Sequence, residues 1–292
     1  MFLPITPNIF FIQAPNSAKF PYCNGLFIQD KLNAIIDTSF GPKMIDKLNQ
    51  EGIDIVINSH FHEDHILNNN LFPHAQILVH EDDAPAVESL DAFSDYYGFK
   101  EPATIQLGLD SLKMIDLKPS KVARKLSANE IIDLGKIQLQ VIHTPGHTPG
   151  HCCFYEEKNH LLFLGDIDLN RFGPWYGHAC SNIDDFIESI NKCISINPSL
   201  VVTSHRGIIT DNIIGRLKDF LDTIYIREEL IIENLAIPHT LDELTAKQIF
   251  YGPSLTLDPL YMAMEKIAIT HHLKRLIKLG QVQQDENLFY LS

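Results

Sequence analysis

Three histidines and one aspartate lie within residues 60–65, as His60, His62, Asp64 and His65. Imidazole and carboxylate groups are protein ligands that suit zinc, manganese and iron. The segment directly follows an apolar run at residues 53–57 that is typical of a buried strand. Because a loop at a strand end can direct several polar side chains to one point, the segment predicts a metal site. The alternative interpretation is a solvated histidine-rich turn.

Three further ligand candidates follow other expected strands. His147 comes after the run at 137–142, Asp166 after the run at 161–164, and His205 after the run at 200–203. Loops at strand ends are where a rigid sheet presents functional groups. The repeated placement predicts that all these residues converge on one centre.

The run from His60 to His65 resembles the H-x-H-x-D-H motif of the metallo-β-lactamase fold superfamily. His147 in Pro-Gly-His-Thr-Pro-Gly, Asp166 in Leu-Gly-Asp and His205 in Ser-His-Arg fit the family's later metal motifs in the same order. The resemblance covers about residues 8–207. It implies an α+β fold, an αββα sandwich with a two-metal site at one edge of the sheets.

The resemblance also implies a role for each candidate ligand. The first metal would be held by His60, His62 and His147, the second by Asp64, His65 and His205, and both by a bridging Asp166. Asp37, which matches the family's early aspartate, would orient a ligand through a hydrogen bond. Two zinc ions are the expected cofactors, with iron or manganese as alternatives.

The implied chemistry is hydrolysis without a protein nucleophile. Two cations would share a water and deliver it as a bridging hydroxide. Asp64, the expected catalytic residue, would orient the hydroxide and shuttle the proton. The ligand set has no cysteine at the second metal and so differs from the antibiotic-hydrolysing lactamases that place one there; it is similar to the glyoxalase II and nuclease branches. The favoured substrate is a small ester or thioester, as in hydroxyacylglutathione hydrolases.

Two other reactions remain open on these residues. An endoribonuclease or other phosphodiesterase would use the same metal pair for in-line attack. A persulfide dioxygenase would use one iron and would leave Asp64, His65 and His205 without a role. A non-catalytic interaction protein would leave the whole ligand set unexplained.

The segment at 166–177 follows the expected bridging carboxylate and holds the only tryptophan. In one interpretation Arg171, Trp175 and Tyr176 face the substrate, and Arg171 binds an acidic group. In the other, the segment is a packed loop with Trp175 and Phe172 in the core. The remaining histidines, which include His151 and His178, are expected to be structural or exposed.

The amino-acid composition narrows the possible binding partners and the expected cellular location of the protein. Of 292 residues, 45% are hydrophobic and 21% charged, which is typical of a globular chain. The 23 basic and 37 acidic side chains give a net charge of −14, which repels nucleic acids and anionic membranes unless a local basic patch intervenes. Five cysteines without a CxxC pair, and no signal peptide or membrane-spanning run, predict a cytoplasmic protein.

The expected elements place the site on two sheets. Strand-like runs at 9–13, 25–29, 34–37 and 53–57 alternate with helical segments, and a second group of strands begins at 137. One helix is expected at 83–95, followed by a loop around Gly98 and Pro102. This order favours two sheets between helices over a sandwich that has no helices.

After residue 207 the predicted elements change from a mixture of strands and helices to mainly helices. Helices are expected at 212–234 and 259–279, and Thr240 and Glu243 fit a capping box. The predicted domains are therefore a catalytic domain at 1–210 and a winged-helix-like domain at 211–292. A basic run at 266–280 would suit a nucleic acid, but its apolar positions fit a packed helix, so nucleic-acid binding is not favoured. An oligomer is left open.

Overall fold

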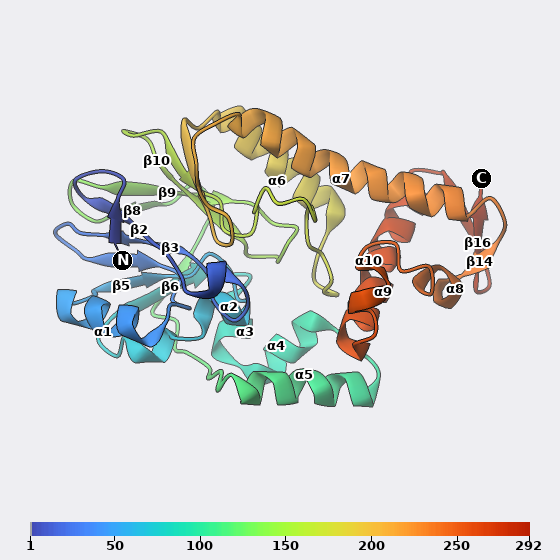
Figure 1. Ribbon diagram of the computed structural model, residues 1–292, viewed down its shortest axis with the longest axis horizontal. Coiled ribbons are helices and arrows are strands. Elements are labelled where there is room, and N and C mark those ends of the chain that lie inside the picture. The colour runs from blue at the N-terminus through green and yellow to red at the C-terminus, as the bar shows by residue number, and fades with distance from the viewer. Residues whose placement is uncertain (1) are drawn as a thin grey trace.

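Two sheets lie face to face between helices in the computed structural model, which describes residues 2–292 (Figure 1). The first sheet has seven strands in chain order: β1 (Phe2–Pro4), β2 (Ile9–Ile12), β3 (Gly25–Ile28), β4 (Ala34–Ile36), β5 (Ile55–Ile57), β6 (Gln76–His80) and β7 (Arg124–Leu126). Pairing is antiparallel from β1 to β4 and parallel from β4 to β7.

The second sheet has six strands in the order β13-β12-β11-β10-β9-β8. They are β8 (Ile131–Asp133), β9 (Gln138–His143), β10 (Cys152–Glu156), β11 (Leu161–Phe163), β12 (Leu200–Thr203) and β13 (Gly207–Ile209). The pair β11 and β12 is parallel and the others are antiparallel. Two parallel neighbours therefore end at the same edge of this sheet.

The central strands are buried on both faces, which explains their unbroken apolar runs. In β5, Ile55 and Ile57 point into the core between the two sheets, whereas Val56 points into the core beneath α1. In β11, Phe163 faces the first of these cores and Leu162 faces the core beneath α6. Because successive strand side chains point to opposite faces, each run contributes to two cores.

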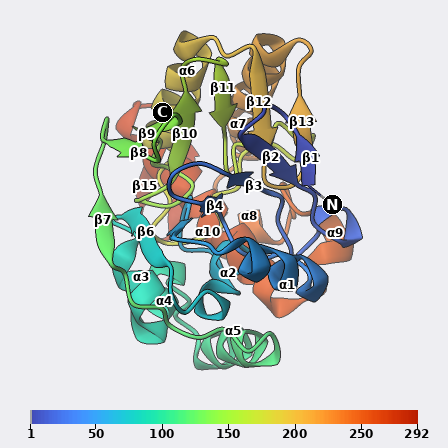
Figure 2. The same ribbon diagram turned by 90° about the vertical axis from the view of Figure 1, so that its left-hand side faces the viewer.

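Helices cover both outer faces, as Figure 2 shows. On the first sheet, α1 (Pro42–Glu51) buries Ile45 and Leu48. On the second sheet, α6 (Ile183–Ile196) is capped by the Asn182 side chain and buries Phe186 and Ile190. The αββα sandwich predicted from the sequence is confirmed.

The helical layer at residues 84–114 differs from the sequence prediction. It consists of α3 (Ala84–Glu88), α4 (Leu90–Tyr97) and α5 (Pro102–Met114), where one helix and a loop were expected. Pro102 stands in the first turn of α5, a position where its missing N–H leaves no helix bond unmade. Only Leu112 of α5 is fully buried, so the helix has a weak apolar pattern. That weak pattern explains why α5 was not predicted, whereas the expected helix at 83–95 is present as two helices, α3 and α4.

The C-terminal residues form three helices and a small sheet around a core of their own. The elements after the long α7 (Ile213–Asn234) are β14 (His239–Thr240), α8 (Leu241–Thr245), α9 (Gly252–Leu255), α10 (Pro259–Lys278), β15 (Val282–Asp285) and β16 (Leu288–Leu291). Ile231, Leu273 and Phe289 belong to the separate core. The capping box of Thr240 and Glu243 is confirmed.

The long helix α7 contributes to both cores. Leu217 and Phe220 pack with α6 on the second sheet, whereas Ile231 lies in the C-terminal core. The division at residues 210 and 211 and the winged-helix interpretation stay predictions. Within residues 2–292, no helix has the length and apolar character needed to cross a membrane.

A largely buried ion-pair network joins three helices. Nη1 of Arg275, on α10, donates to both carboxylate oxygens of Glu228, on α7, each at 2.8 Å. Nε of Arg275 donates to Asp184, on α6, at 2.7 Å. Hydrogen bonds from Lys278 and then from Arg275 hold the pKa of Asp184 below its ordinary value. The network connects the C-terminal helices to the helix that covers the second sheet.

Replacing Arg275 with Met should lower the free energy of unfolding by about 2–4 kcal/mol, because Glu228 then stays buried without its partner. The matched control is Arg216→Met. Arg216 donates to Asp211 at 2.6 Å, but the two side chains are 40% and 73% exposed, so this pair should contribute less than about 1 kcal/mol. Urea denaturation of both variants measures the difference, and equal losses would contradict the prediction.

Candidate metal centre

The seven predicted ligands lie in segments that follow β5, β9, β11 and β12 at one edge of the two sheets. The turn after β5 and the short helix α2 (Glu63–Ile66) carry four of them, and the three later loops carry one each. In chain order they are His60, His62, Asp64, His65, His147, Asp166 and His205. The structure therefore brings together residues that are far apart in the sequence.

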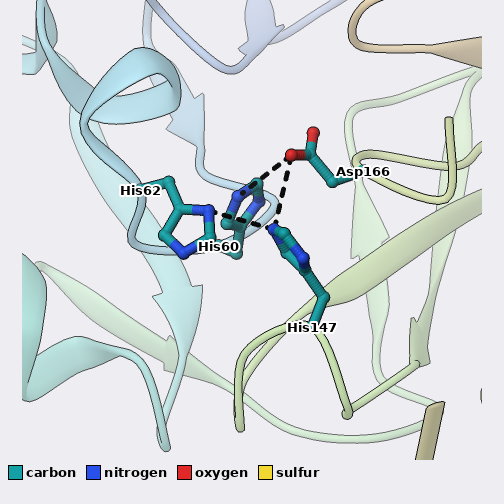
Figure 3. A group of neighbouring side chains, drawn as sticks. All are labelled: His60, His62, His147 and Asp166. Atoms are coloured by element: carbon teal, nitrogen blue, oxygen red, sulfur yellow. Dashed lines mark hydrogen bonds and ion pairs between the residues drawn. The ribbon is translucent and has the colours of Figure 1, made fainter. Parts of the chain in front are cut away.

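The first cluster consists of His60, His62, His147 and Asp166, whose ligand atoms all lie within 4.8 Å of one another (Figure 3). Nε2 of His147 lies 3.0 Å from Nδ1 of His62 and 3.3 Å from Oδ2 of Asp166. Nε2 of His60 lies 3.9 Å from the same oxygen. Three imidazoles and one carboxylate at these distances suit a tetrahedral cation such as zinc.

The second cluster consists of Asp64, His65 and His205. Nε2 of His205 lies 3.5 Å from Asp64 Oδ2, and Nε2 of His65 lies 3.7 Å from Asp64 Oδ1. Asp166 reaches this cluster with its other oxygen: Oδ1 lies 3.0 Å from His65 Nε2 and 3.5 Å from His205 Nε2. Asp166 thus stands between the clusters with one oxygen toward each.

Several buried polar atoms at the centre have no hydrogen-bond partner, and these atoms indicate whether the site fits cations. His60 Nε2, His65 Nε2 and Asp166 Oδ1 are buried and make no hydrogen bond within the described residues. Buried polar atoms almost always have a partner, and leaving one without any costs about 1–3 kcal/mol. Because all three atoms point into the two clusters, divalent cations there would satisfy them. The residues therefore fit a pair of metal ions.

Hydrogen bonds on the far side of the rings aim three imidazoles at the centre. Nδ1 of His65 donates to Asp37 Oδ2 at 2.9 Å. Nδ1 of His147 donates to the carbonyl of Trp175 at 2.8 Å, and Nδ1 of His205 to the carbonyl of Ala18 at 2.6 Å. A proton held on Nδ1 leaves the lone pair on Nε2 for a metal. Asp37 lies where its predicted orienting role requires.

Three residues at the centre were missed by the sequence analysis. Nε2 of His62 lies 3.1 Å from Nδ1 of His178, and Nε2 of His151 accepts the backbone N–H of Asp166 at 3.2 Å. Asp168 accepts the backbone N–H of His205 at 2.9 Å. Only Asp168 had a sequence signal, since it stands two residues after Asp166 in the same loop.

Asp83 was also missed, and it connects two ligand loops. Its Oδ2 accepts the N–H of Phe61 at 3.0 Å and the hydroxyl of Thr148 at 2.7 Å, and its Oδ1 accepts the N–H of Gly150 at 2.6 Å. Phe61 stands between His60 and His62, and Thr148 follows His147. Burial raises the pKa of Asp83 to about 7, although the three hydrogen bonds oppose this. Asp83 therefore fixes the spacing of the first cluster.

The two clusters differ in how readily their imidazoles are protonated. Burial lowers the pKa of His60 and of His62 well below the ordinary value of 6.5. Burial also disfavours charge on His65 and His205, but nearby carboxylates outweigh it and raise both pKa values well above 6.5. His60 and His62 are therefore neutral at neutral pH, whereas His65 and His205 hold protons there.

A cavity of about 480 Å³ opens onto the centre. Its lining includes five of the ligand candidates, His62, Asp64, His147, Asp166 and His205. Trp175 and Phe172 form one wall, and Leu260, Tyr261 and Met264 of α10 form another. The C-terminal helices therefore complete the cavity that the two sheets begin.

The structure corrects the predicted substrate role of Arg171 and Tyr176. Trp175 lines the cavity, but Arg171 is exposed and is not among its lining residues, and Tyr176 is buried with 2% exposure. The cause is Arg227 of α7, which donates to the Tyr176 hydroxyl at 2.7 Å and to the carbonyls of Pro174 and Phe172, each at 2.6 Å. These bonds hold Tyr176 in the core.

Residues 19–205 match the family described as the metallo-beta-lactamase superfamily. This chain belongs to that superfamily. Its two-cluster centre is that of a metal-dependent hydrolase.

Three relatives and one solved structure are similar to this chain. An atrochrysone carboxyl ACP thioesterase of Pseudocercospora fijiensis is 24% identical over 300 residues, which cover 95% of this chain and 77% of that protein. The human acyl-coenzyme A thioesterase MBLAC2 is 23% identical over 169 residues, 57% of each chain. An uncharacterized Aquifex aeolicus protein is 32% identical over 83 residues, 39% of its length. A metallo-beta-lactamase family protein from Thermus thermophilus superimposes with a TM-score of 0.76 at 22% identity, over 99% of this chain and 100% of that one.

Acidification should release the second metal before the first. His65 and His205 have raised pKa values, so a cation must displace their protons at neutral pH, and each displaced proton weakens binding about ten-fold per pH unit of acidification. His60 and His62 have lowered pKa values and stay neutral, so affinity at the first cluster should change little. Zinc titration calorimetry at pH 8, 7 and 6 measures both affinities; equal slopes would contradict the prediction.

Asp83→Asn should weaken binding at the first cluster by about 10–100-fold, because its amide N–H₂ then faces at least one backbone or hydroxyl donor and the ligand loops separate. The control is Asp46→Asn, since Asp46 is exposed on α1 and belongs to none of the candidate metal clusters among the described residues. Equilibrium dialysis with zinc compares the variants. An unchanged first affinity in Asp83→Asn would show that Asp83 does not position the ligands.

Proposed function

We propose that this chain is a two-zinc hydrolase of a small thioester or ester. The observation that carries the proposal is Asp166, whose two oxygens face two separate ligand clusters. One metal would be held by His60, His62 and His147, the other by Asp64, His65 and His205, with Asp166 shared. Bound zinc ions supply Lewis-acid polarisation of a carbonyl and a nucleophile at neutral pH.

The chain's own residues supply the remaining functions. Asp64 is 14% exposed and lines the cavity, so its carboxylate is placed to take a proton from an attacking water and return it to the leaving group. Trp175 and Met264 exclude water from the apolar walls. The hydrogen bonds from His65 to Asp37 and from His147 to Trp175 keep the rings in place during the reaction.

The substrate class rests on the cavity and on the relatives. A cavity of about 480 Å³ is of the size that takes small molecules. Two relatives are named as thioesterases, and one of them matches 95% of this chain. Apolar and aromatic walls beside the ligands suit an acyl group. Thioester is therefore favoured over a phosphodiester on a chain with a net charge of −14.

Removal of metal should abolish thioester hydrolysis. Dialysis against a chelator is expected to reduce kcat/KM for an acetyl thioester by at least about 100-fold, and two equivalents of zinc should restore it. Asp64→Asn should reduce kcat by about 10²–10⁴-fold, while Asp46→Asn, outside the cavity, should have no effect. Elemental analysis of the purified protein gives the metal and its stoichiometry.

Three results would contradict this function. Cleavage of single-stranded RNA by protein that leaves every thioester intact would identify the phosphodiesterase alternative. One iron per chain with oxygen consumption on a persulfide would identify the dioxygenase. Metal-loaded protein that is inert towards thioesters, esters, RNA and persulfides would leave an interaction protein.

A further inference from the structure

A second, smaller cavity adjoins the cavity at the metal centre. It measures about 70 Å³ and is lined by residues of α4, α5 and the start of α10, the first two of which lie at the bottom of Figure 1. We refer to it as the side pocket. The residues that line both cavities are Glu63, Tyr97, Ser111, Leu260 and Met264. These shared residues place the two cavities side by side.

The lining of the side pocket is almost entirely apolar. The residues that line it but not the larger cavity are Phe93, Ser94, Phe99, Ile105, Gly108, Leu109 and Leu112. The polar groups at the boundary are already paired: Tyr97 donates its hydroxyl to Glu63 Oε2 at 2.6 Å, and Ser111 donates to the carbonyl of Leu107 at 3.0 Å. Such a surface gains free energy by burying methylene groups and offers little to a polar group.

We propose that the side pocket binds the acyl chain of the substrate, an inference that rests on the proposed thioester hydrolysis. A water molecule requires roughly 15 Å³ of cavity on this measure, so 70 Å³ holds about five heavy atoms. An acyl chain of about four to six carbons fits this space. The thiol carrier is larger and polar, so it extends through the cavity of about 480 Å³.

The reaction then has a defined orientation. Water adds to the thioester carbon, a C–O bond forms and the C–S bond breaks, giving a carboxylic acid and a thiol. The proton lost by the water returns to the departing sulfur through Asp64. The chain of the acid stays between α5 and α10 until release, whereas the thiol leaves by the larger cavity.

Gly108 provides a way to fill the side pocket without disturbing the metal centre. A Cβ at this position would meet only the ring of Phe99, at 3.5 and 3.6 Å, which is ordinary van der Waals contact. A leucine side chain there would extend into the pocket. Gln106 lies on the same helix, is exposed and lines neither cavity, so Gln106→Leu is a matched control.

The test measures chain-length selectivity with N-acetylcysteamine thioesters of two to eight carbons. In the zinc-loaded wild-type protein, kcat/KM should rise about three- to four-fold for each methylene, up to about six carbons. Gly108→Leu should lower the ratio of hexanoyl to acetyl kcat/KM at least ten-fold, and Gln106→Leu should leave the ratio unchanged. Ile105→Ala enlarges the pocket and should move the optimum to longer chains.

A binding measurement separates this inference from the proposed function. Trp175 is the only tryptophan and lines the larger cavity, so its fluorescence can report the binding of acetate, butyrate, hexanoate and octanoate. Tightening with chain length that disappears in Gly108→Leu supports the pocket, even where no thioester is cleaved and the proposed function fails. Selectivity that is the same in Gly108→Leu, Gln106→Leu and wild type would overturn the pocket and leave the hydrolase standing.

Discussion

The structure depends on the crowding of four imidazoles around one buried carboxylate. Nε2 atoms of His60, His65, His147 and His205 lie 3.0–3.9 Å from Asp166 oxygens. So many polar groups in a water-poor site are costly unless each has a partner, either a cation or a hydrogen bond. The rings hold this arrangement because their other nitrogens are bonded to the scaffold. Each ring is therefore fixed at the far side, so its other nitrogen stays directed at the centre.

Parallel strands of the scaffold place the ligand loops at one edge of the sheets. β11 and β12 are parallel neighbours, and their ends place Asp166 and His205 at the same edge. The turn after β5 adds two histidines, and Asp83 connects that turn to the loop of His147 by three hydrogen bonds. The geometry of the centre is thus set by residues that touch no metal. Changes at Asp83 or Asp37 would alter ligand spacing without removing a ligand.

The candidate ligands predicted from the sequence lie together in the structure, whereas the residues that support them were not predicted, for a physical reason. His60 to His65 form a dense local pattern after a buried strand, so the pattern and the site coincide. Asp83 bonds partners 22 and 65 residues away, and His178 contacts a ring 116 residues away. Such contacts leave no periodic signal in the chain. The inward position of Tyr176 was missed for the same reason, since it depends on Arg227 of a distant helix.

The large sequence separation between the contributing residues also explains why the substrate cavity could not be derived from the ligand motif. Leu260 and Met264 of α10 line both the larger cavity and the side pocket, and α5, for which the sequence analysis made no prediction beyond the loop at Pro102, supplies the opposite wall. The pair of Arg275 with Glu228 holds α10 against α7, and Arg227 on α7 holds the loop of Trp175. Metal chemistry and substrate choice are therefore encoded in different parts of the chain. Divergence of α5 and α10 can change the acyl group accepted while the ligand motif stays the same.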